Sequence, residues 1–222
     1  MSLGSPVSND RHCWGFRQVA SLPLPGRSFR RGWSTAEALD DGAASTMVRP
    51  MSEGIMLTPV ARGTLLTQDE RKARLEQALP QIRAALDGER DAVAIEATLA
   101  CLLWETLTQT NWCGFYRRVS DRTLAVGPYH GTMGCLRIDF GRGVCGACAR
   151  TREVQLVPDV SQFPDHIACD DRTRSELVIP VVAGGELRAV LDLDSPHLDA
   201  FSREEADLLV GLLADVFAEA TF

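Results

Sequence analysis

The chain has 222 residues, of which 45% are apolar, and its 23 basic residues against 30 acidic ones give a formal net charge of -7. This length accommodates one domain with a buried core and an additional extension. The acidic balance argues against a nucleic-acid surface, and the apolar runs are too short for a membrane span or a secretory signal. We therefore expect a soluble, cytoplasmic protein that binds neither nucleic acid nor membrane.

The N-terminal quarter differs in composition from the rest of the chain. Residues 1–56 contain arginines separated by Ser, Gly and Pro, without a sustained hydrophobic period. This pattern predicts a poorly ordered N-terminal extension, followed by a single domain over residues 57–222. An arginine-rich, acid-poor leader is also typical of an organelle transit peptide, which is the alternative interpretation.

Helical patterns lie at both ends of the predicted domain. Thr67 with Glu70 forms a capping box that should start a helix, and Ser202 with Glu205 forms another before a C-terminal amphipathic segment. A second helix is expected over residues 91–108 because apolar residues recur there at helical spacing. Its predicted apolar face consists of Val93, Ile95, Leu99, Leu102 and Leu103.

Between these helices the chain shows short apolar segments bounded by glycine and polar residues, which is typical of strands. A glycine turn followed by a helical pattern interrupts them at residues 141–151. The arrangement predicts an α+β fold, in which N- and C-terminal helices flank an antiparallel sheet of five or six strands. The predicted strands are residues 112–119, 123–129, 135–140, 154–160, 175–182 and 186–195.

Three cysteines suggest sulfur redox chemistry. Cys169 lies in the sequence HIACD on a polar loop at residues 161–174, and Cys135 and Cys145 lie upstream in GCLRIDFGRGVCG. A reactive thiol needs neighbours that favour its thiolate, and a second thiol is needed to recycle its oxidised form. Cys145 should also lie near the N-terminus of the short helix, where the helix dipole is positive.

A second set of residues is acidic. Asp192 and Asp194 are two positions apart on a predicted strand and therefore share one face of the sheet, and Glu176 lies on the preceding strand. Carboxylates in an otherwise apolar site need a cation or a hydrogen-bond donor, which indicates a ligand with an ammonium group or a role in proton delivery. The alternative is that these carboxylates are solvated and that Asp194 begins a turn before Pro196.

The order of several sequence blocks is informative. NWCGFY, GPYHG, CLRIDFGRGVCG, HIACD, SELVIPV and VLDLDS follow one another between about residues 68 and 219. In this order and spacing the chain resembles the free methionine-R-sulfoxide reductases, a family of stand-alone GAF domains. The resemblance implies a GAF-like fold for the domain and an enzymatic rather than a structural role.

The resemblance also implies roles for individual residues. Cys169 would attack the sulfoxide sulfur and Cys135 would resolve the oxidised product, with Cys145 as an alternative resolving thiol. An aromatic wall around the substrate and a set of carboxylates for its polar groups would complete the site. The implied substrate-binding residues are Trp112, Tyr116, Glu176, Asp192 and Asp194.

The implied reaction is reduction of free L-methionine-R-sulfoxide to L-methionine, through a cysteine sulfenic acid and an intramolecular disulfide. Thioredoxin, supplied with electrons from NADPH, would reduce the disulfide, so that no bound cofactor or metal is required. A free amino acid, unlike a residue in a polypeptide, presents an ammonium group to an acidic pocket. Many GAF domains form dimers, and the sequence leaves a homodimer open.

Two alternatives follow from the same residues. Cys148 stands where the family commonly has a small residue without a thiol, and with Cys145, His166 and Cys169 it could make a four-ligand structural zinc site. Such a site would remove the free thiolate. The second alternative is a ligand-sensing GAF module without catalysis, because a fold alone does not decide function.

Overall fold

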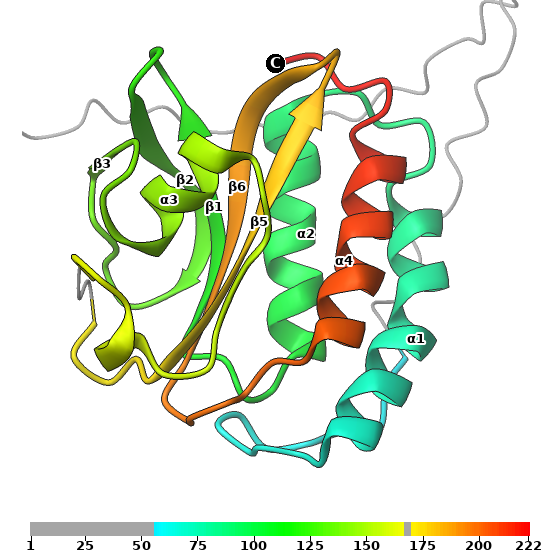
Figure 1. Ribbon diagram of the computed structural model, residues 1–222. Helices are drawn as coiled ribbons and strands as arrows, with labels where there is room; N and C mark the ends of the chain where they lie inside the picture. The colour runs from blue at the N-terminus through cyan, green and yellow to red at the C-terminus, as the bar shows by residue number, and fades with distance from the viewer. Residues whose placement is uncertain (1–55, 167–169) are drawn as a thin grey trace, which may run out of the picture. The chain divides into compact units, whose positions relative to one another are not determined.

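The computed structural model describes residues 56–166 and 170–222. The extension predicted for residues 1–56, apart from Met56, lies outside the described residues, and so does Cys169. Within the described residues the expected α+β fold is confirmed (Figure 1). The predicted strands all form, and every neighbouring pair is antiparallel.

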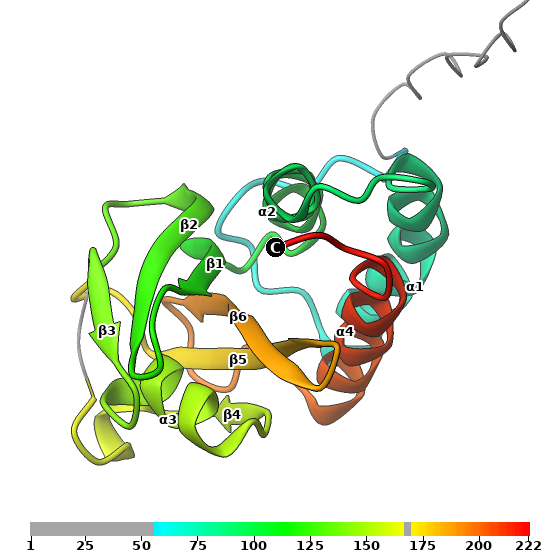
Figure 2. The same ribbon diagram turned by 90° about the horizontal axis from the view of Figure 1, so that it is seen from above.

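Six strands make one sheet in the order β3-β2-β1-β6-β5-β4. Helices α2 and α4 pack against one face of this sheet and α1 packs against both of these helices, whereas the short helix α3 lies on the other face (Figure 2). The strands are β1 Trp112–Arg118, β2 Thr123–Gly131, β3 Arg137–Asp139, β4 Gln155–Val157, β5 Ser175–Ala183 and β6 Glu186–Ser195. The helices are α1 Gln68–Ala85, α2 Ala92–Thr106, α3 Gly143–Thr151 and α4 Arg203–Val216.

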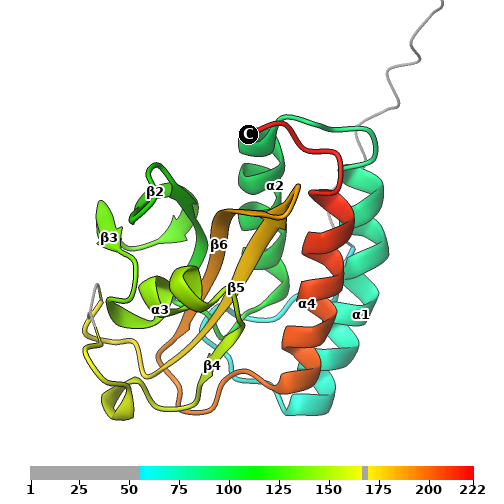
Figure 3. The same cartoon turned by 45° about the horizontal axis from the view of Figure 1, so that its top comes forward.

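Both predicted capping boxes form. Thr67 caps α1 together with Glu70, and Ser202 caps α4 together with Glu205. The two helices run side by side (Figure 3) and are joined by a buried ion pair, in which Arg71 Nε lies 3.1 Å from Glu205 Oε1. Glu205 therefore serves both the start of α4 and its attachment to α1.

Helix α2 is capped by Asp91, whose side chain accepts a hydrogen bond from the Ala94 amide. The predicted apolar face is wrong at Val93, whose side chain is 44% exposed. Ile95 and Leu99, spaced by four, are fully buried against the sheet. Val93 lies two positions before Ile95, which places it about 200° away around the helix and therefore on the solvent side.

Strand alternation separates two cores. On β1, Cys113 and Phe115 point towards the three helices and join the larger core. Trp112 and Tyr116 point to the opposite face and join a smaller core with α3. Because successive side chains of a strand point to opposite faces, the residues next to the smaller core come from every second position of β1, β5 and β6.

Helix α3 lies unusually close to the sheet edge. A side chain at Gly146 would place its Cβ 2.3 Å from the carbonyl oxygen of Asp139, at the end of β3. Only glycine permits this approach of the two backbones. The contact brings Val144 and Cys145, in the first turn of α3, over the side chains of β5 and β6.

Candidate active site

A cavity of about 30 Å³ lies on the α3 face of the sheet. Its walls come from β1, β5 and β6, from the first turn of α3, and from the loops that follow β2 and precede β5. The residues that line it include Trp112, Tyr116, Thr132, Cys145, His166, Asp170, Glu176, Asp192 and Asp194. Six of the eight residues expected from the sequence therefore line one cavity.

The strand register explains why these residues meet. Trp112 of β1 is paired with Asp194 of β6, which is paired in turn with Glu176 of β5. One step along the sheet, Gly114 is paired with Asp192. An aromatic ring and three carboxylates thus project from adjacent positions on one face. Gly114 has no side chain, which allows Tyr129 of β2 to lie close to its backbone.

The aromatic side chains form a stack. The Trp112 ring lies 5.4 Å from the ring of Tyr116 and 5.1 Å from that of Tyr129, with interplanar angles of 17° and 14°. The Trp112 indole donates a hydrogen bond of 3.1 Å to the Thr132 carbonyl. Sequence reasoning missed Tyr129, because its partner ring lies on another strand and only the pairing of β1 with β2 brings the two together.

The three carboxylates are buried, and all have a raised pKa. Burial is the main cause for each. Asp194 adds to the rise in the pKa of Glu176, Glu176 adds to that of Asp192, and Asp192 to that of Asp194. Ionising all three neighbouring carboxyl groups would cost much free energy, because their negative charges repel one another. The three groups together therefore either retain protons, which they can donate, or attract a cation.

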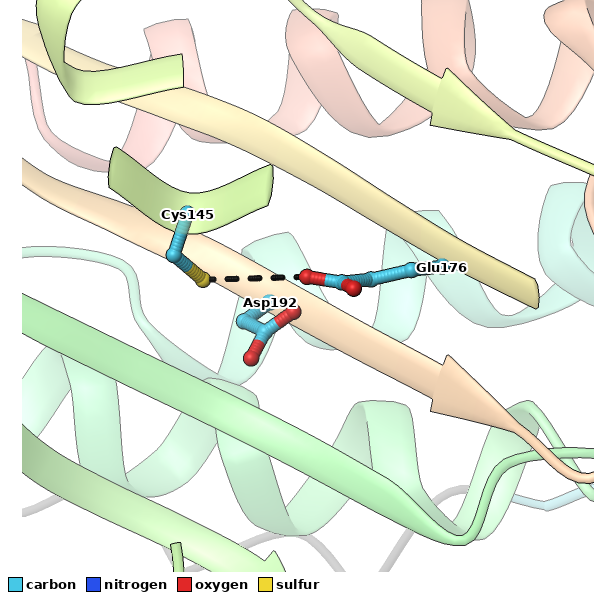
Figure 4. A group of neighbouring side chains, drawn as sticks. All are labelled: Cys145, Glu176 and Asp192. Carbon is cyan, nitrogen blue, oxygen red and sulfur yellow. Dashed lines mark hydrogen bonds between the residues drawn. The ribbon is translucent and has the colours of Figure 1, made fainter. Parts of the chain in front are cut away.

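Cys145 lies in the first turn of α3, as expected, with its Sγ 3.9 Å from Oε1 of Glu176 (Figure 4). Burial raises the pKa of this thiol well above its ordinary value, and the charges of Asp192 and Glu176 raise it further. The position at the helix N-terminus does not offset these effects. Cys145 is therefore a protonated thiol in this environment, whatever its helix position suggests.

Cys135 packs against the smaller core and is disulfide-bonded. Among the residues that the structure describes, the other four cysteines, Cys101, Cys113, Cys145 and Cys148, are free. The backbone of Cys135 also hydrogen-bonds the Tyr116 hydroxyl. The loop that carries Cys135 is thereby attached to the aromatic stack.

Asp170 connects two loops, a role that sequence reasoning did not anticipate. Its Oδ2 accepts hydrogen bonds from the Thr132 hydroxyl at 2.9 Å and from the Asn111 amide at 3.1 Å. The guanidinium of Arg172 also binds this carboxylate, and it is the main reason why the pKa of Asp170 lies well below its usual range. Asp170 thus ties the segment before β5 to the loop that leads to Cys135.

The proposed zinc ligands are only partly together. His166 Nε2 lies 3.6 Å from Glu176 Oε2, and burial lowers the pKa of this imidazole. The Cys148 thiol instead lies 3.8 Å from the carbonyl oxygen of Val178. Cys169, the fourth expected ligand, lies outside the described residues, so the set as a whole stays a prediction.

Comparison with known proteins identifies the family. The GAF domain profile matches residues 70–220. The chain is 41% identical over 133 residues to the free methionine-R-sulfoxide reductase of Escherichia coli, and the match covers 60% of this chain and 80% of that protein. It is 37% identical over 142 residues to the free methionine-R-sulfoxide reductase of Saccharomyces cerevisiae, and that match covers 61% of this chain and 79% of the yeast protein. The chain belongs to the free methionine-R-sulfoxide reductases, within the GAF fold. Members of this family are oxidoreductases.

A solved structure of the family gives the same fold. The free methionine-R-sulfoxide reductase of Neisseria meningitidis, determined in complex with its substrate, is 36% identical, with a TM-score of 0.64 over 71% of this chain and 94% of that one. The expected GAF-like fold is therefore confirmed. Within the described part of the chain, no helix combines the length and apolar character that crossing a membrane would require.

Proposed function

We propose that residues 57–222 reduce free L-methionine-R-sulfoxide to L-methionine. The observation that carries the proposal is the meeting of an aromatic stack and three buried carboxylates in one cavity, with a disulfide-bonded cysteine packed against the same core. The names of the Escherichia coli, yeast and Neisseria relatives support this substrate.

Binding would depend on complementarity to a free amino acid. The carboxylates of Glu176, Asp192 and Asp194 would receive the substrate's ammonium group, whose positive charge offsets their mutual repulsion. Trp112 and Tyr116 would pack against the methyl and methylene groups next to the sulfur. Methionine sulfoxide within a polypeptide has a neutral peptide nitrogen and would leave the acids without a cation.

The chemistry would begin with Cys169 as a thiolate that attacks the sulfoxide sulfur. Burial raises the pKa of Glu176 and of Asp192, so one of these two carboxyl groups would hold a proton and donate it to the sulfoxide oxygen. Methionine leaves, and the oxygen remains on Cys169 as a sulfenic acid. The thiol of Cys135 then displaces that oxygen as water, forming a Cys135–Cys169 disulfide, and thioredoxin returns both sulfurs to thiols.

The disulfide-bonded state of Cys135 supports its assignment as the resolving thiol. Cys145, which is a free and protonated thiol beside Glu176, is the alternative. Its raised pKa makes it a poor nucleophile at neutral pH and so favours Cys135.

The assignment is tested by turnover of the separate R and S epimers of free methionine sulfoxide with thioredoxin, thioredoxin reductase and NADPH. We expect activity on the R epimer alone. Cys169→Ser should abolish it, and Cys135→Ser should allow one rapid turnover followed by slow recycling. Cys101→Ser, a partly exposed cysteine of α2 outside the cavity, is the matched control and should behave as the parent. Undiminished multiple turnover in Cys169→Ser would refute the proposed nucleophile.

A further inference from the structure

Three side chains from different elements converge beneath α3. Cys145 of α3, Glu176 of β5 and Asp192 of β6 each offer one ligand atom, and these three atoms lie within 4.8 Å of one another (Figure 4). All three residues are buried. The combination of one sulfur and two carboxylate oxygens is a metal-ligand set rather than an ordinary acidic cluster.

A second observation points to a missing ligand. Asp192 is only 5% exposed, yet its Oδ1 has no hydrogen-bond partner among the described residues. Buried carboxylate oxygens are normally paired, because leaving one unpaired costs its full desolvation energy. Asp192 also lines the cavity, whose volume of about 30 Å³ exceeds the space needed for one water-sized species.

We propose that Cys145, Glu176 and Asp192 bind a thiophilic divalent cation, represented by Zn²⁺, and that the bound ion excludes the substrate. The inhibitory part rests on the proposed reductase function, whereas the binding part does not. The site differs from the structural zinc set considered above, since it needs neither Cys148 nor Cys169.

The geometry requires little rearrangement. Around a tetrahedral zinc ion, with Zn–S of about 2.3 Å and Zn–O of about 2.0 Å, ligand atoms lie roughly 3.3–3.5 Å apart. The Cys145 sulfur and the nearer Glu176 oxygen are already 3.9 Å apart. Side-chain rotations that move atoms by about 1 Å would close the set around the ion, and a water would take the fourth position.

Charge and ligand type determine which cations fit. On binding, the Cys145 thiol and any protonated carboxyl group of Glu176 or Asp192 release their protons to solvent, so that the dication faces three negative groups that would otherwise repel one another. Thiolate ligation favours Zn²⁺ and its soft analogue Cd²⁺ over Mg²⁺ and Ca²⁺, which prefer sites made of oxygen alone. The ion would occupy the carboxylates proposed to receive the substrate's ammonium group.

Binding is tested on the full chain in its disulfide form, so that Cys135 is not available as a ligand. Zn²⁺ is titrated in competition with a chromophoric chelator, and Cd²⁺ is followed by its ultraviolet thiolate-to-metal charge-transfer band. We expect one ion per chain, with binding at least about 10-fold weaker in Asp192→Asn and the charge-transfer band lost in Cys145→Ser. Cys148→Ser, a buried thiol three residues away on the same helix, should bind as the parent does, and Mg²⁺ and Ca²⁺ should not compete.

Two results would overturn the site: failure of the disulfide form to bind either ion, or a charge-transfer band that persists in Cys145→Ser. Thermal unfolding with and without metal shows whether each variant is folded, and Zn²⁺ should stabilise the parent and Cys148→Ser equally and the two ligand variants less or not at all. A variant that unfolds cooperatively but gains no stability has lost the site rather than the fold.

The kinetic arm separates this site from the proposed reaction. With Cys148→Ser as control, Zn²⁺ should raise KM for methionine-R-sulfoxide without lowering kcat, because ion and substrate compete for the same carboxylates. Metal binding without sulfoxide reduction would leave the site intact and reject the reductase. Reduction of the sulfoxide without metal binding would reject the metal site and leave the reductase function standing. Inhibition by Zn²⁺ that lowers kcat alone would show that the ion does not exclude the substrate.

Discussion

At the residue scale, Asp192 is a group whose charge opposes folding. Burial raises its pKa, and Glu176 raises it further, so the folded protein holds the proton more tightly than the unfolded chain does. A group of this kind stabilises the protein at a pH below its unfolded pKa, and this contribution is lost as the pH rises. A cavity built to receive a cation therefore destabilises the ligand-free protein at neutral pH.

Asp192→Asn should accordingly make the protein more stable and the enzyme less active. We expect a higher unfolding temperature at pH 8 and little change at pH 4, together with a roughly 10- to 100-fold loss of kcat/KM for methionine-R-sulfoxide, since a charged hydrogen bond is lost. Calorimetry at both pH values and steady-state kinetics measure the two effects. Asp207→Asn, an exposed carboxylate of α4, is the control. A variant with unchanged kcat/KM would show that Asp192 does not contact the substrate.

Asp170 acts on geometry rather than on charge. Its carboxylate bridges Thr132 and Asn111, and it adjoins the cysteine proposed as nucleophile. Asp170→Asn should slow disulfide formation by about 10-fold, because the carboxylate uses Oδ2 for Thr132 and Asn111 and Oδ1 for Arg172, whereas an amide has only one accepting oxygen and no charge. Rapid-mixing measurement of thiol loss after one turnover, compared with release of methionine, isolates this step.

The neighbouring acid provides the matched control for that experiment. Asp171 is exposed, and Asp171→Asn should leave both rates unchanged. Equal slowing of methionine release and thiol loss in Asp170→Asn would instead indicate a general disturbance of the cavity.

At the element scale, helix α2 carries a carboxylate into the core side of the sheet. Glu96 is fully buried, 3.3 Å from Arg117 Nε of β1, but neither of its oxygens has a well-formed hydrogen bond within the described residues. Burial raises its pKa to about 7, although Arg117 opposes the rise. The contact between α2 and the sheet therefore weakens as the pH rises from about 4.5 to about 7.

Glu96→Gln should remove this pH dependence. We expect the free energy of unfolding to increase by about 1–3 kcal/mol at pH 8 and to remain nearly unchanged at pH 4, where the parent side chain is protonated in both states. Urea denaturation across this pH range measures the difference. Glu105→Gln, on the exposed side of the same helix, should show neither effect. A variant less stable than the parent at pH 8 would mean that the Arg117 ion pair outweighs desolvation.

At the scale of the whole molecule, the buried pair of Arg71 and Glu205 joins the first and last helices of the domain. Arg71→Met should destabilise the domain by about 3 kcal/mol, because it leaves the Glu205 charge buried without its partner. Arg83→Met, which removes an exposed partner of Asp215 on the same two helices, should cost less than about 1 kcal/mol. Equilibrium unfolding in urea compares the two, and equal losses would contradict the role of burial.

Much of the architecture was predictable because its signals are local. The capping residues Thr67 and Ser202 gave helix starts that agree with the structure, and the spacing of Asp192 and Asp194 correctly placed both on one face. Capping patterns and strand alternation depend on residues a few positions apart, so one sequence contains them. The tertiary environment of a side chain was harder to predict. The pKa of Cys145 is raised by burial and by nearby acids, although its place at a helix N-terminus favours a lower pKa.

What escaped prediction depends on segments far apart in the chain. Tyr129 joins the aromatic stack through strand pairing, and Asp170 reaches Thr132 across 38 positions. Val93 was misplaced because an apolar residue at the start of a helix can face solvent when the sheet lies on its other side. The role of Cys169 stays a prediction, since it lies outside the described residues.

The sheet keeps its two faces separate. The core beneath α1, α2 and α4 shares no side chain with the core beneath α3 in the described part of the chain. A substitution of a cavity residue therefore replaces no side chain of the larger core, and the reverse also holds. Natural variation can in consequence change the residues that determine substrate specificity one at a time, without replacing the residues that form the larger core.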